Sequence, residues 1–166
     1  NHPSIVTWVP FNEGWGQFQT KEIAEFVKGL DPTRLVNATT GWADRGVGDM
    51  NDMHSYPGPG MFPVEENRAS VLGEFGGQAL VVPEHLWVTD LSKAPTHYKT
   101  STSADALHQK YAAMIDSLGL LKKKGLSAAV YTQTTDVESE VNGLMTYDRE
   151  VVKFDEAELR VMNQKV

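Results

Sequence analysis

Short apolar and β-branched runs, each bounded by glycine, proline or polar residues, are the main pattern along this chain. They predict five strands, at residues 5–9, 35–39, 52–56, 70–75 and 127–132. Apolar residues at helical spacing predict helices over 17–30, 103–124 and 155–164. Strands that alternate with helices across short turns are typical of an α/β barrel or a doubly wound sheet.

The predicted helix ends have recognisable capping residues. Ser103 and Asp155 are suited to cap the second and third helices, because their side chains can accept from free backbone N–H groups. Gly125 follows three lysines and is expected to end the second helix, while Pro32 cannot continue the first. Residues 76–102 show little periodicity and predict a long irregular segment, a kind of loop that is often functional.

Composition excludes several classes of function. The chain has 166 residues and 40% hydrophobic content, enough for one domain over residues 1–166. A net charge of −7 argues against a nucleic-acid partner, and no apolar run approaches the length of a membrane span. The absence of cysteine excludes thiolate metal sites and disulfides. The acidic segment 136–143 lacks the central glycine of a calcium-binding EF-hand loop, so we predict no metal and no cofactor.

Two predicted strands each end in a glutamate that glycine follows. Glu13 comes after the run at 4–9, and Glu74 comes after the run at 69–73. A single glutamate after a strand is more often a solvated loop residue or a capping acid. Two strands that each present one carboxyl group are, however, what glycoside hydrolysis requires.

The first of these segments resembles a known family. NHPSIVTWVPFNEGWG is similar to the acid/base strand of glycoside hydrolase family 2, which includes β-galactosidases, β-glucuronidases and β-mannosidases. VLGEFGG resembles the nucleophile strand of that family, and KGLDPTRLVNATTGW resembles the helix-to-strand passage between the two. The resemblance extends from residue 1 to about residue 149.

This resemblance implies a fold and an activity. The fold would be a (β/α)8 TIM barrel, here a partial barrel covering roughly strands 4 to 8. The activity would be that of a retaining exo-β-glycosidase, β-galactosidase-like, in carbohydrate metabolism, with Glu13 as acid/base and Glu74 as nucleophile. Five strands cannot close a barrel, so we expect the exposed edges to favour self-association. The family alone suggests a periplasmic or secreted location, which the residues do not fix.

Five further residues are candidates to bind the sugar. Asn12 matches the residue that binds the 2-hydroxyl group, although asparagine also forms turns. Tyr56 matches the tyrosine that bonds the nucleophile, or is a core aromatic residue. His54 shares its strand face, although a single histidine is more often a structural hydrogen-bonding residue than a ligand. Trp15 and Trp42 follow strands and could stack on sugar rings, or could simply pack beneath a loop.

Two alternative interpretations remain at this stage. The chain could be a non-catalytic carbohydrate-binding or scaffold relic of the same barrel, which a divergent pair of glutamates would favour. It could also be a related barrel glycosidase, although the Asn-His-Pro-Ser opening argues against that. The family tryptophan at the end of the last strand is missing, and Tyr131 or Gln133 would have to replace it, so the sugar is not identified.

Overall fold

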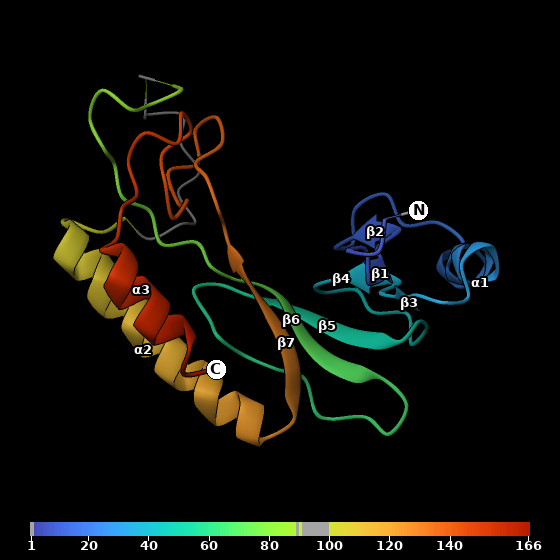
Figure 1. The fold of residues 1–166 in the computed structure, drawn as a ribbon. Helices are drawn as coiled ribbons and strands as arrows, with labels where there is room; N and C mark the ends of the chain where they lie inside the picture. The colour runs from blue at the N-terminus through green and yellow to red at the C-terminus, as the bar shows by residue number, and fades with distance from the viewer. Residues whose placement is uncertain (1, 89, 91–99) are drawn as a thin grey trace. The chain divides into compact units, whose positions relative to one another are not determined.

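The computed structural model describes residues 2–88, 90 and 100–166 (Figure 1). Asn1, where the family resemblance begins, lies outside the described residues, as do residues 89 and 91–99 of the predicted irregular segment. Two-residue strands open the chain: β1 (Thr7–Trp8), β2 (Phe11–Asn12), β3 (Leu35–Val36) and β4 (Thr39–Thr40). The longer strands are β5 (Met50–Ser55), β6 (Ala69–Gly76) and β7 (Leu126–Thr132), and the helices are α1 (Thr20–Leu30), α2 (Ala104–Lys123) and α3 (Glu156–Asn163).

The predicted helices and their caps are confirmed. The Ser103 hydroxyl accepts from the Ala106 N–H at 3.1 Å, and the Asp155 carboxylate accepts from the Glu158 N–H at 2.9 Å. Each bond satisfies one donor that has no partner inside its helix. Gly125 has a φ of +109°, a backbone conformation that glycine adopts without steric cost, so the chain reverses there into β7.

The two predicted strands at 5–9 and 35–39 are not continuous, which corrects the sequence prediction. Within residues 5–9 only β1 forms a strand, and β2 begins after Pro10, because proline has no N–H to donate to a ladder. The second is divided into β3 and β4. This run is also largely exposed, since the Val6 and Val9 side chains are 68% and 46% exposed.

These strands form separate small sheets. β1 pairs in parallel with β3, β2 pairs in parallel with β4, and the other three strands form a sheet in the order β5-β6-β7. The Ala69 N–H donates to the Asp49 carbonyl and the Gly76 N–H donates to the Pro57 carbonyl, so β5 and β6 run parallel. The described residues form no closed barrel, and the predicted partial barrel is not confirmed; the elements are those of an α/β fold.

The chain divides into two compact units. The first contains residues 1–55, 60–74 and 123–130, and Ala24, Val36 and Ala38 form a core between α1 and the short strands. The second contains residues 56–59, 75–122 and 131–166. Glu13, His54 and Glu74 all belong to the first unit, so the geometry of the candidate site depends on that unit alone.

The second unit is built on two helices that lie side by side (Figure 1). The Tyr111 hydroxyl of α2 donates to Asn163 of α3 at 2.8 Å, and its ring packs edge-on against Phe154 and Tyr131. Tyr131 also packs against Phe75, which places it in an aromatic core. None of the described helices is long and apolar enough to cross a membrane.

Candidate active site

Glu13 lies immediately after β2 in a constrained turn. Its φ is +56°, a left-handed conformation that costs a residue with a side chain roughly 1–3 kcal/mol. The Glu13 N–H donates to the Thr40 carbonyl at 2.8 Å, and the Glu13 carbonyl accepts from the Thr39 hydroxyl at 3.0 Å and from Gln17 Nε2 at 2.6 Å. The pairing of β2 with β4 therefore fixes the backbone from which this carboxyl group projects.

His54 connects Glu13 with Glu74, which lies on β6. The Nδ1 atom of His54 is 2.9 Å from Glu13 Oε1 and 3.4 Å from Glu74 Oε2. The His54 side chain is only 2% exposed, whereas the carboxylates keep 24% and 32% of their side-chain surface in contact with solvent. The two glutamates that are 61 positions apart in the sequence (74 − 13) thus converge on one imidazole nitrogen.

Asp52 is a buried site-supporting residue that sequence reasoning missed. Its carboxylate accepts from Asn37 Nδ2 at 2.5 Å, from the Gly73 N–H at 2.8 Å and from the Gly41 N–H at 3.4 Å. Burial raises the pKa of Asp52, and these hydrogen bonds offset part of that rise. The signal in the sequence was an acid two residues before His54 on one strand, because that spacing puts both side chains on the same face.

Trp15 and Trp42 lie together beside Glu13. Their rings meet edge-on, with centroids 5.5 Å apart, and their side chains are 73% and 45% exposed. The Trp42 ring packs on the backbone of Gly14, where an added Cβ would lie 2.3 Å from it. Both rings are exposed to solvent, and the expectation that they stack on a sugar stays a prediction.

Trp8 and Phe11, two other aromatic residues near Glu13 in the sequence, contact Asp31 and Phe18. The Trp8 indole donates to Asp31 at 3.0 Å, and the Phe11 ring packs edge-on against Phe18. Hydrogen bonds from Thr33 and then Trp8 lower the pKa of Asp31 well below its usual range. These contacts tie the residues around β1 and β2 to Asp31 and Phe18.

Asn12 and Tyr56, two predicted sugar-binding residues, have different hydrogen-bond partners. Asn12 is exposed at the end of β2, and its amide oxygen accepts a hydrogen bond from the Thr40 hydroxyl. Tyr56 belongs to the second unit, where its hydroxyl donates to Thr132 Oγ1 at 2.9 Å. The predicted bond of Tyr56 to the nucleophile stays a prediction. Gln133, considered as a sugar contact, donates to Glu140 and Asn142.

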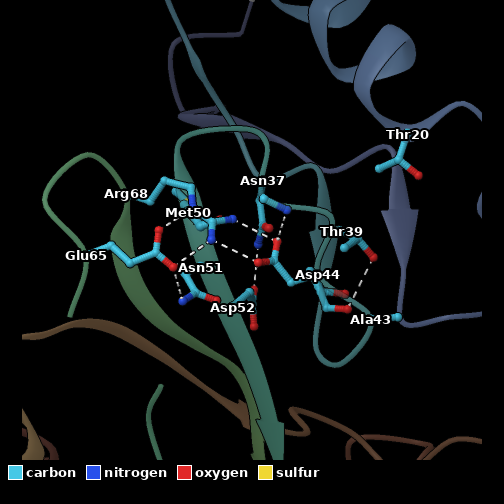
Figure 2. Close-up of polar contacts among 12 residues, drawn as sticks. Thr20, Asn37, Thr39, Ala43, Asp44, Met50, Asn51, Asp52, Glu65 and Arg68 are labelled. Carbon is cyan, nitrogen blue, oxygen red and sulfur yellow. Dashed lines mark hydrogen bonds and ion pairs between the residues drawn. The ribbon is translucent and has the colours of Figure 1, made fainter. Parts of the chain in front are cut away.

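An ion-pair cluster holds the segment that leads into β6 (Figure 2). Arg68 bonds both oxygens of Asp44, at 2.8 and 2.9 Å, and both oxygens of Glu65, at 2.7 Å each. Asn51 on β5 donates to Glu65 at 2.6 Å, which ties the cluster to the neighbouring strand. The Arg68 guanidinium lowers the pKa of Asp44 below its ordinary value. Bidentate pairs of this kind fix the relative positions of the two side chains, so the cluster anchors the chain at the start of β6, the strand that carries Glu74.

The carboxyl pair and His54 are also close enough to be considered as metal ligands. One atom from each of Glu13, His54 and Glu74 lies within 4.8 Å of the others, a spacing that one divalent cation could span. The sequence predicted no metal. Glycoside hydrolysis by two carboxyl groups requires no metal ion.

The comparison with protein families gives a match for the first part of the chain. Residues 1–66 match the family described as glycosyl hydrolases family 2, TIM barrel domain. This segment is similar to glycoside hydrolase family 2. The match confirms the resemblance read from the sequence and indicates glycosidase function in general terms. No curated protein matches the chain.

The family 2 match contains most of the candidate site but not all of it. Glu13, His54 and Tyr56 lie inside residues 1–66, as do Asn12 and both tryptophans. Glu74 lies eight residues beyond the end of the match (74 − 66). The case for Glu74 therefore rests on its convergence with Glu13 at His54, which is an observation of the fold.

Proposed function

We propose that this chain carries the two catalytic carboxyl groups of a retaining exo-β-glycosidase that is β-galactosidase-like and acts in carbohydrate metabolism. The observation that carries the proposal is the convergence of Glu13 and Glu74, with one oxygen of each within 4.8 Å of the other. Retaining glycosidases hold their carboxyl groups roughly 5–5.5 Å apart, whereas inverting enzymes separate them by about 6.5–9.5 Å to admit a water. The spacing supports retention, and convergence favours an enzyme over a non-catalytic relic.

The proposed roles follow from the double-displacement mechanism. The Glu74 carboxylate attacks the anomeric carbon, the bond to the leaving group breaks, and the leaving oxygen takes a proton from Glu13. In the second step Glu13 removes a proton from water and the water oxygen bonds the anomeric carbon, while the bond between that carbon and the Glu74 oxygen breaks and leaves Glu74 as a carboxylate. The partial exposure of both carboxylates supports these roles, since sugar and water must reach them.

The remaining predicted residues would bind the substrate. The oxygen of Asn12 is held by Thr40, so its amide nitrogen would donate to the 2-hydroxyl group of the sugar, a contact that strengthens in the transition state. The pair of exposed tryptophans, Trp15 and Trp42, would present an apolar face to the sugar ring. Tyr56 and His54 would complete the sugar-binding set, and no cofactor would be required.

A panel of aryl β-glycosides tested on the intact protein checks the activity and identifies the sugar. We expect Glu74→Gln to abolish turnover, because the nucleophile is lost. Glu13→Ala should retain activity only on substrates with good leaving groups, which need no proton. Glu66→Gln and Glu66→Ala are matched controls, because Glu66 is exposed and outside the site.

Two results would contradict the proposal. Equal losses on activated and unactivated glycosides in Glu13→Ala would remove its role as the acid. An initial product of inverted anomeric configuration, detected by NMR during hydrolysis, would show that the carboxyl spacing does not serve retention.

A further inference from the structure

His54 presents one ring nitrogen to two carboxylates. Its Nδ1 atom lies 2.9 Å from Glu13 Oε1, a normal hydrogen-bond length, and 3.4 Å from Glu74 Oε2, at the outer limit of one. The difference between the two distances is small enough that a modest side-chain rotation would exchange the partners. A single N–H group therefore lies within reach of both carboxyl groups of the proposed mechanism.

The other ring nitrogen shows which tautomer His54 adopts. Nε2 is buried and has no hydrogen-bond partner among the residues that the structure describes. A proton on Nε2 would be a buried donor without an acceptor, whereas a proton on Nδ1 points at two acceptors. The hydrogen-bond environment thus favours a neutral imidazole that carries its proton on Nδ1 and donates it toward the carboxylates.

The imidazole ring is held in place by the backbone beneath it. An added Cβ at Gly41 would lie 2.7 Å from the His54 ring, so the ring packs directly on that glycine. Gly41 also donates its N–H to Asp52, the buried acid two residues before His54 on β5. The ring can turn slightly between its two acceptors but has no room to leave them.

We propose that His54 is a positioning residue whose Nδ1–H group donates alternately to Glu74 and Glu13, following the negative charge as it moves between them. This inference rests on the proposed function. In the resting enzyme the charge is on Glu74, so the 3.4 Å contact to Glu74 would shorten at the expense of the 2.9 Å contact to Glu13. Once Glu74 has formed the ester to the sugar, the charge is on Glu13, which has given its proton away. His54 keeps its own proton in both steps. It stabilises whichever carboxylate is ionised, because hydrogen bonds to charged acceptors are stronger than those to neutral ones.

The test separates the two half-reactions in the intact protein. With a 2,4-dinitrophenyl β-glycoside of the sugar that the wild type prefers, kcat/KM reports formation of the glycosyl-enzyme. When its hydrolysis limits turnover, kcat reports that second step. His54→Leu removes the donor and should lower both parameters, each by about 10- to 100-fold. His54→Asn keeps an amide N–H group near the position of Nδ1 and should restore both parameters to within a few-fold of wild type.

The possible outcomes are distinguishable. If His54→Leu lowers only one parameter, or neither, while the wild type is active, the shared-donor role is wrong and the glycosidase proposal stands. If both fall and His54→Asn fails to restore them, His54 is merely structural. Should His54→Leu not fold, His54→Gln replaces it, because the glutamine amide lies one bond farther from the backbone than the position of Nδ1. Equal rates in the Asn and Gln variants would then refute the inference. An inactive wild type would instead refute the proposed function.

Discussion

The contact between Gly73 and Asp52 gives the most direct test of the structure beneath the candidate site. Gly73 lies on β6, one residue before Glu74, and its N–H donates to the Asp52 carboxylate at 2.8 Å. In the variant Gly73→Ala the added Cβ would lie 2.4 Å from both carboxylate oxygens of Asp52. Contacts that short do not occur between a methyl group and oxygen, so the carboxylate would have to move.

The cost of that movement can be worked from the bonds that Asp52 makes. Moving its carboxylate away from Gly73 breaks or weakens the bonds from the Gly73 N–H and from Asn37 Nδ2. Hydrogen bonds to charged groups contribute about 1.5–3 kcal/mol each. We therefore expect Gly73→Ala to lower the free energy of unfolding by roughly 3–5 kcal/mol. A shift of the adjacent Glu74 backbone should also reduce kcat.

Urea denaturation followed by tryptophan fluorescence measures the effect. Gly29→Ala is the matched control, because Gly29 lies in α1 with nothing within 4 Å of an added Cβ; it should stabilise the protein by about 0.5–1 kcal/mol. Adding Asp52→Ala to Gly73→Ala should cost less than the sum of the two single variants, because the clash is then absent. A Gly73→Ala protein as stable as wild type would refute the packing described here.

Three further predictions concern other parts of the chain. Lys153→Met should destabilise the protein by about 3–5 kcal/mol in thermal or urea unfolding, because the buried Asp136 carboxylate, 2.7 Å from Lys153 Nζ, would lose its counter-ion. The double variant Lys153→Met with Asp136→Leu should recover much of the lost stability. Arg68 lowers the pKa of Asp44, so this pair stabilises the fold above the ordinary aspartate pKa, near 4, and the stabilisation is lost as the pH falls through the lowered pKa. Asp44→Asn should therefore flatten the dependence of the unfolding free energy on pH in that range. An unchanged slope would contradict this prediction. We also propose that the exposed side of β7 allows self-association, since that strand lies at the end of its sheet and Val130 is 55% exposed. Light scattering at low micromolar concentration should show dimers that Val130→Lys disrupts. A monomeric wild type would refute this proposal.

The first predicted strand, at residues 5–9, shows what could not be predicted from composition. The β-branched composition of residues 5–9 indicated an extended chain, and the two strands that flank Pro10 are extended. How far a ladder continues depends on which strand lies alongside, and the partners of β1 and β2 are separate two-residue strands about 28 positions away. Composition carries no information on that pairing, so the predicted length of the strand was wrong.

The sequence by itself determined the local features of this protein. Helix capping by Ser103 and Asp155, the turn at Gly125 and the family 2 match over residues 1–66 depend on neighbours in the chain, so short patterns suffice to predict them. Only the tertiary structure decided that Glu13 and Glu74 meet at His54 and that Asp52 supports them from beneath. Those contacts join β2, β5 and β6 across tens of residues, and their geometry depends on the parallel pairing of strands and on close packing at Gly41 and Gly73, which no local pattern encodes.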